Sequence, residues 1–146
     1  MFNISDLFPY QFDPKYSKPV AYFSMEFAVD QPLKSYSGGL GFLAGSHLRS
    51  AYELRQNMIG IGILWKKGYY DQERNQDQTL KVNFRDKEYF FLTDTKITFP
   101  ITIHGARVYV KAFVLKPGVF NTVPLFLLTT DIPENDYLAQ TISHRL

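Results

Sequence analysis

The stretch Ser35-Tyr36-Ser37-Gly38-Gly39-Leu40-Gly41 decides the fold, because it joins a short apolar segment to a longer amphipathic one. Its glycines lack Cβ atoms, so the backbone can turn sharply from a strand into a helix, adopt positive φ and approach a ligand closely. From Leu40 onward, apolar residues recur every three or four positions, which predicts a helix with one buried face. Those residues are Leu40, Leu43, Ala44, His47, Leu48, Ala51 and Leu54.

The start of such a helix favours an anion such as phosphate, because its first N–H groups are open and its dipole is positive there. We therefore expect an anion-binding loop at Gly38 and Gly39. The spacing alone also suits a tight turn that binds nothing. The dinucleotide fingerprint G-x-G-x-x-G is absent, and no G-K-[ST] triplet occurs, which argues against a nucleotide P-loop.

Two short apolar segments flank the predicted helix. Residues 20–25 and 58–65 each read as a buried parallel strand, so strand, helix and strand form a βαβ unit with a right-handed crossover. Gly60 and Gly62 in the second strand suit close packing rather than ligand contact. Glu26 follows the first strand, at the edge of the sheet where ligands gather in α/β proteins.

The second half of the chain has the pattern of an antiparallel insertion. Residues 73–78 read as a solvated loop, and short strands are expected at 81–84 and 89–92. Residues 97–103 and 107–114 flank a turn at His104-Gly105-Ala106, which predicts a hairpin, and residues 123–129 read as another buried strand. The run Asp131-Ile132-Pro133-Glu134 predicts a helix start. Its apolar face, at Leu138, Ile142 and Leu146, continues to the last residue, so we expect a longer protein.

Composition narrows the class of protein. With 146 residues, 45% of them hydrophobic, one globular α/β domain is expected, preceded by an aromatic and proline-rich arm at residues 1–18. The net charge of +2 comes from scattered Lys and Arg residues, which argues against nucleic acid. The absence of cysteine fits a reducing cytoplasm. No signal peptide or membrane-spanning run is expected.

Other chemical candidates carry less weight. His47 reads as a core residue, and neither His104 nor His144 pairs with it at metal-ligand spacing, so no metal site is expected. Glu26 and Asp30 could be paired carboxylates, but nothing indicates a glycosidase. Tyr69 and Tyr70 could stack on a sugar, although packing at the core or its rim is the better interpretation. No catalytic residue is assigned.

Four blocks of sequence, taken in order, closely resemble the start of bacterial α-glucan (glycogen/maltodextrin) phosphorylases. They are VAYFSMEF at 20–27, YSGGLGFLAGSHL at 36–48, GIGIL at 60–64 with GYYDQ at 68–72, and TDIPEN at 130–135. The resemblance implies the N-terminal, Rossmann-like half of a GT-B glycosyltransferase, with residues 19–146 as part of that domain and the C-terminal half missing. It also implies transfer of a terminal α-1,4-glucosyl unit to inorganic phosphate, which gives glucose 1-phosphate.

The resemblance assigns roles to the glycine loop. Gly38 and Gly39 would lie near the phosphate of pyridoxal 5′-phosphate, the family's cofactor, whose Schiff-base lysine belongs to the missing half. The substrate pocket would be lined by Glu26, Ser37, Gly38, Gly39, Leu40 and Gly41. The implied partners are α-glucan, phosphate and glucose 1-phosphate, with no nucleic acid or membrane and with a homodimer left open.

This sequence departs from the family pattern at two positions. Ser46 stands where the family often has Asp, and Ser37 stands where animal and plant members have Asn, although many bacterial members share the serine. The alternative enzyme is a glycogen or starch synthase, which places a lysine two residues before the glycine pair. Tyr36 occupies that position and Lys34 lies too early. The alternative of another class is a non-catalytic glucan- or anion-binding fragment, and the 146 residues alone are expected to be inactive.

Overall fold

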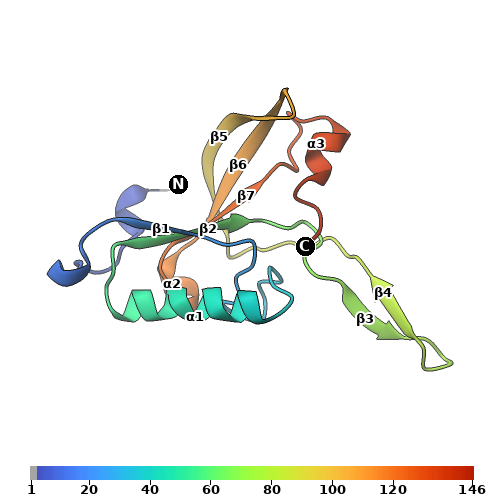
Figure 1. Cartoon of the computed structure of the whole chain (residues 1–146), viewed down its shortest axis with the longest axis horizontal. Helices are drawn as coiled ribbons and strands as arrows, with labels where there is room; N and C mark the ends of the chain where they lie inside the picture. The colour runs from blue at the N-terminus through green and yellow to red at the C-terminus, as the bar shows by residue number, and fades with distance from the viewer. Residues whose placement is uncertain (1–2) are drawn as a thin grey trace.

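The computed structural model describes residues 3–146 and contains a five-stranded mixed sheet with the strand order β1-β2-β7-β6-β5. Strands β1 (Val20–Phe23), β2 (Met58–Ile63) and β7 (Leu125–Thr129) are parallel, whereas β6 (Ala106–Leu115) and β5 (Thr93–Ile103) complete the sheet in antiparallel pairings. Helix α1 (Gly39–Glu53) runs along one face of the sheet (Figure 1). The expected α/β class and parallel βαβ core are therefore confirmed.

Several smaller elements surround the sheet. Strands β3 and β4 pair with each other and project from the body as a separate hairpin (Figure 1). The small elements are η1 (Ile4–Asp6), η2 (Pro14–Tyr16), β3 (Asp71–Arg74), β4 (Leu80–Asn83), α2 (Pro117–Phe120) and α3 (Tyr137–Thr141). Among the described residues, no helix is long and apolar enough to cross a membrane.

The core lies between α1 and the sheet. Gly60 and Gly62 let α1, the loop before it and β7 pack closely on β2: a Cβ atom at Gly60 would lie 2.9 Å from Leu48 and from Leu125, and one at Gly62 would lie 2.8 Å from Phe27. The expected packing role of both glycines is thus confirmed. The buried cluster is Phe27, Val29, Leu33, Ala44, Leu48, Ala51, Met58, Leu115, Val123, Leu125 and Leu127.

Strand β1 is parallel as predicted, but it is not buried. It pairs only with β2 and forms the edge of the sheet, and Phe23 at its end is 70% exposed. A continuous apolar run predicts burial only when both faces of the strand are covered. Here α1 covers one face, where Tyr22 packs against the core, and Val20 and Phe23 remain exposed.

Helix α1 exists where it was predicted, and its buried face is confirmed in part, since Ala44, Leu48 and Ala51 are buried as expected. Leu40 and Leu43 were expected in the core, yet Leu43 is 68% exposed. The buried positions are Gly41, Ala44, Gly45, Leu48 and Ala51. A Cβ atom at Gly45 would lie 2.2 Å from the Ala28 carbonyl oxygen, so backbone rather than side chains packs against this end of the helix. A count of apolar side chains leaves out Gly41 and Gly45, which complete the buried face.

The predicted hairpin is confirmed, whereas two neighbouring predictions are wrong. Strands β5 and β6 meet at a turn in which His104 and Gly105 have φ of 49° and 81°, the geometry of a two-residue hairpin loop. The strand expected at 89–92 is wrong, because those residues form a turn. The loop expected at 73–78 is wrong at its start, since Glu73 and Arg74 belong to β3.

The predicted helix start at residues 131–134 is also wrong. Those residues lie in a turn, and α3 begins only at Tyr137. Asp136 is the residue that caps it, because its Oδ1 accepts a hydrogen bond of 2.8 Å from the Ala139 N–H. The expected apolar face does not form, since Leu138 and Ile142 are exposed.

Candidate functional site

The connection from β1 to α1 is a long ordered loop rather than a tight glycine turn. It spans residues 24–38 and is held at both ends: Trp65 Nε1 donates to the Met25 carbonyl at 3.0 Å, and the Ala28 N–H donates to the Gly41 carbonyl at 2.9 Å. The expected positive φ is wrong here. Gly38, the residue before α1, has a φ of −165°, which is ordinary extended backbone.

The carboxylate of Glu26 occupies part of the helix start. Oε2 accepts hydrogen bonds from the N–H groups of Ser37 at 3.0 Å and Gly38 at 3.3 Å, and Oε1 accepts one from the Ser37 hydroxyl at 2.9 Å. Partial burial tends to raise the pKa of Glu26, but hydrogen bonds from Ser37, Gly38 and Gly41 outweigh it, so this pKa lies below its ordinary value. Glu26 is therefore an anionic cap for α1.

Two N–H groups at the helix start remain available. No described residue accepts a hydrogen bond from the N–H of Gly39 or Leu40, the first two residues of α1. A Cβ atom added at Gly38 or Gly39 would meet nothing within 4 Å. The backbone of the glycine pair therefore borders open space, and its free donors are of the kind that bind an anion.

Gly41 has a different role from the glycine pair. A Cβ atom at this position would lie 2.4 Å from Tyr36 Cβ and 3.2 Å from Glu26 Oε2. Its side-chain-free backbone thus allows the first turn of α1 to pack against the loop. The structure brings the six expected substrate-site residues together in one region: Glu26, Ser37, Gly38, Gly39, Leu40 and Gly41.

The histidines do not form a metal centre. His47 is exposed rather than in the core, and its ring lies 4.9 Å from the ring of Tyr22. It lies next to the buried face of α1 rather than within it. His104 is in the hairpin turn, and His144 contacts Asp131 at 3.1 Å. The described residues contain no group of three or more His, Cys, Asp or Glu side chains placed to hold a metal ion.

The other two candidate sites were the carboxylate pair Glu26 and Asp30 and the tyrosine pair Tyr69 and Tyr70. Glu26 caps α1 while Asp30 pairs with Arg49 at 3.6 Å, so the two carboxylates serve different partners. The rings of Tyr69 and Tyr70 lie against each other with centroids 4.2 Å apart, but Tyr69 is exposed and neither side chain packs on the core cluster.

One polar cluster was not expected from the sequence. Lys66 and Asp131 follow the neighbouring parallel strands β2 and β7, and Lys66 Nζ lies 2.8 Å from Asp131 Oδ2, while His144 Nε2 lies 3.1 Å from Oδ1. Partial burial tends to raise the pKa of Asp131, but the contacts with Lys66 and His144 hold it below its ordinary value. The signal that could have found the cluster is the shared carboxyl edge of two adjacent strands.

Comparison with known proteins places the chain beside phosphorylases. No family model matches it. It is 55% identical over 129 residues to an uncharacterized protein of Methanocaldococcus jannaschii, 37% over 137 residues to the maltodextrin phosphorylase of Thermococcus litoralis, and 35% over 135 residues to the glycogen phosphorylase of Mycobacterium tuberculosis. The expected resemblance to α-glucan phosphorylases is confirmed. The matches cover 88%, 88% and 87% of this chain but only 25%, 16% and 15% of the relatives.

Proposed function

We propose that this chain is the part of an α-glucan phosphorylase that carries the phosphate-facing loop, within the N-terminal half of a GT-B fold in the cytoplasm. The whole enzyme would transfer a terminal α-1,4-glucosyl unit to inorganic phosphate and release glucose 1-phosphate. Similarity to two named phosphorylases over most of the chain supports the class. The observation that carries the proposal is the pair of unpartnered N–H groups at Gly39 and Leu40, beside open space at the start of α1.

The proposed work of this chain is to hold a phosphate against the helix start. The N–H groups of Gly39 and Leu40 would donate to its oxygens, and the positive end of α1 would add to the attraction. Such donors are fixed before the reaction begins, so they stabilise charge that develops on the phosphate without reorganising. Ser37 and Gly38 are held in place by Glu26, which keeps the loop in one arrangement.

A second phosphate could approach the same backbone. Gly38 and Gly39 have no side chain, and a Cβ atom at either would meet nothing within 4 Å, so this backbone would leave room for the phosphate of pyridoxal 5′-phosphate as well. When bound, this cofactor supplies a phosphate group that assists the inorganic phosphate. Its Schiff-base lysine would come from outside this chain, and none of the lysines described here is given that role.

A synthase is a weaker proposal. In that family a lysine two residues before the glycine pair binds the sugar nucleotide, whereas Tyr36 stands there and packs against Phe42 with ring centroids 5.3 Å apart. The 146 residues alone would behave as a glucan- or anion-binding fragment, because they span about a quarter or less of the length of these relatives.

The test is a chimaera in which this chain replaces the matching segment of the Thermococcus litoralis maltodextrin phosphorylase. We expect the chimaera to form glucose 1-phosphate from glycogen and phosphate, and the isolated chain to form none. A folded chimaera without activity, compared with the parent enzyme in the same assay, would overturn the proposal. Activity in the isolated chain would contradict the expectation that the missing parts are required.

A further inference from the structure

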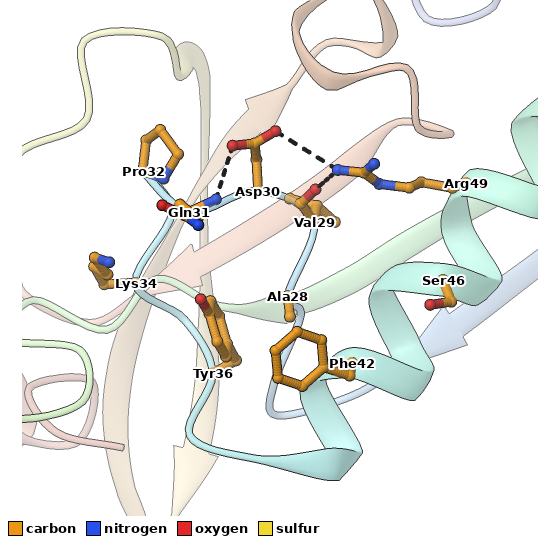
Figure 2. Close-up of a pocket in the computed structure, with 10 residues that line it drawn as sticks. All are labelled: Ala28, Val29, Asp30, Gln31, Pro32, Lys34, Tyr36, Phe42, Ser46 and Arg49. Carbon is orange, nitrogen blue, oxygen red and sulfur yellow. Dashed lines mark hydrogen bonds and ion pairs between the residues drawn. The ribbon is translucent and has the colours of Figure 1, made fainter.

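A groove of about 910 Å³ lies between the loop at residues 28–36 and the side of α1 that faces it (Figure 2). Phe42, Ser46 and Arg49 are spaced so that they share that side of the helix, and the close-up shows Tyr36 and Lys34 coming from the loop. The groove is large enough for several sugar rings, within the usual range for small-molecule sites. The proposed phosphate function uses none of these side chains.

Aromatic rings form one end of the groove. The rings of Tyr36 and Phe42 meet edge to face with centroids 5.3 Å apart, and Phe42 is 59% exposed although it lies on the helix next to the loop. Aromatic faces carry negative charge density, which attracts the slightly positive C–H bonds of a pyranose ring. Phe42 therefore offers an apolar platform without being part of the core.

Planar polar groups form the other end of the groove. Asp30 Oδ2 lies 3.6 Å from Arg49 Nη2, which is longer than a hydrogen bond, and both side chains are partly exposed. Asp30 Oδ1 accepts the Gln31 N–H at 2.8 Å, and Arg49 also donates to the Val29 carbonyl. Each group keeps hydrogen-bonding capacity for neighbouring hydroxyls. Asp30 offsets one of the two positive charges of Lys34 and Arg49, so the groove carries little net charge and its donors and acceptors suit a polyhydroxyl ligand.

We propose that this groove binds glucosyl units of an α-glucan chain, with Phe42 stacking on a sugar ring and with Asp30, Gln31 and Arg49 bonding its hydroxyls. The choice of α-glucan rests on the proposed phosphorylase function. The groove and the glycine pair share the first turn of α1, because Tyr36 packs where a Gly41 side chain would stand. They remain separate sites, since the groove residues do not include Gly38, Gly39 or Leu40.

The experiment is titration calorimetry of the 146-residue chain with maltoheptaose, with affinity electrophoresis in glycogen gels as a second readout. We expect Phe42→Ala to weaken binding by about tenfold, the scale of one lost aromatic contact. Phe42→Tyr should retain binding, whereas Phe42→Leu, which keeps apolar area but no ring, should not. Leu43→Ala is the matched control, because Leu43 is the neighbouring exposed apolar residue on α1 and does not line the groove.

Absence of maltoheptaose binding by the wild-type chain, or equal affinity in Phe42→Ala, would overturn the inference. In the chimaera, the inference predicts a raised KM for glucan and an unchanged KM for phosphate in Phe42→Ala. If the chimaera is active and its KM for glucan is the same with and without Phe42→Ala, the groove is not a glucan site, and the phosphorylase proposal is unaffected. An inactive chimaera, together with Phe42-dependent sugar binding by the chain, rejects the phosphorylase proposal and keeps the groove.

Discussion

Gly39 and Gly41 lie two positions apart at the start of α1, but an added methyl group would meet different surroundings at each. At Gly39 it would enter open space, and at Gly41 it would meet Tyr36 at 2.4 Å. We therefore predict that Gly39→Ala leaves the stability of the chain unchanged or slightly raised, because alanine is the better helix former. The same change should weaken phosphate binding, because the added methyl group would stand where the phosphate has to approach the N–H groups. Turnover of the chimaera should fall on the order of a hundredfold, as when a phosphate can no longer reach one oxyanion donor.

Gly41→Ala should instead lower the stability of the chain and change phosphate binding less than Gly39→Ala does. Overpacking against Tyr36 is expected to cost about 1–3 kcal/mol in free energy of unfolding. Urea denaturation of both variants, together with phosphate titration followed by calorimetry, separates the two effects. Wild-type phosphate affinity in Gly39→Ala would show that the helix start is not the phosphate site.

Glu26 makes a pH-dependent contribution to the same region. Its pKa in the folded chain is below the ordinary value, so the stabilisation is present above the ordinary pKa and is lost as the pH falls through the folded value. We predict that Glu26→Gln is less stable than wild type at pH 7 and that this difference shrinks in acid. Comparing the two proteins isolates Glu26 from the other carboxylates, and a difference that stays constant with pH contradicts the capping role.

The same substitution also bears on anion binding. Glu26 places a negative charge beside the amides that face the proposed phosphate, so removing the charge should tighten phosphate binding several-fold, as expected for like charges roughly 4–6 Å apart that are screened as in water. Salt should reduce the difference between Glu26→Gln and wild type, because exposed charges are screened. Calorimetric titration with phosphate at two ionic strengths measures both effects. Weaker phosphate binding by Glu26→Gln would contradict the repulsion.

For single residues, the sequence predicted which side chains lie near the start of α1 but not the hydrogen bonds that they form. Glu26 and Ser37 were both expected at the site, because one follows a strand and the other precedes the glycine pair. Their hydrogen bonds join residues eleven positions apart through a loop whose course has no local pattern. His47 was misplaced for a related reason, since the buried face of α1 includes Gly41 and Gly45, which a count of apolar side chains leaves out.

Among the elements, the N-terminal arm contacts α1 through the aromatic side chain of Tyr10. Tyr10 packs edge to face against Tyr52 of α1 with ring centroids 5.5 Å apart, and its hydroxyl donates to the Gln56 carbonyl at 3.0 Å. Burial, with a smaller effect from Tyr52, raises the pKa of Tyr10 to about 12. Stabilisation by the neutral phenol is therefore complete below its ordinary pKa of 10.0 and is lost as the pH rises through about 12.

We predict that Tyr10→Phe lowers the free energy of unfolding by about 1 kcal/mol, because the Gln56 carbonyl loses its donor. It should also remove a tyrosine that ionises near pH 12 from the ultraviolet titration. Tyr16→Phe is the control, since no described residue accepts a hydrogen bond from the Tyr16 hydroxyl. Equal stabilities of the two variants would contradict docking of the arm through Tyr10.

Elements with a local signature were predicted well, and those set by distant contacts were not. The β5–β6 hairpin follows from a glycine turn between alternating segments, and β7 from a continuous apolar run. By contrast, residues 89–92 have the composition of a strand but form a turn, with Tyr89 and Phe91 packed on the core cluster and the Tyr89 hydroxyl accepting the Lys34 N–H at 3.2 Å. A contact 55 residues away overrides local propensity there.

Over the whole molecule, the sheet is covered unevenly. Helix α1 and the core cluster bury the side that holds Leu125 and Leu127, whereas Phe23 and Met25 are exposed at the end of β1. They border an apolar hollow of about 310 Å³ with Ile61, Ile63 and Leu128. A run of apolar residues has the same sequence pattern whether its face of the sheet is covered or open. The sequence therefore could not show that the face at Phe23 and Met25 is open.

Because one face of the sheet is buried and the other is open, substitutions on the two faces should differ in their effect on stability. Phe23→Ser should leave the thermal midpoint of the chain close to wild type, because Phe23 is 70% exposed and little of its surface is removed from water on folding. Leu125→Ala should cost about 2–5 kcal/mol, because Leu125 is fully buried and the change leaves a cavity between α1 and β2. Calorimetric unfolding of both variants measures the contrast. A large loss of stability in Phe23→Ser would mean that another surface covers β1 in solution, since an open edge strand derives almost none of its stability from that side chain.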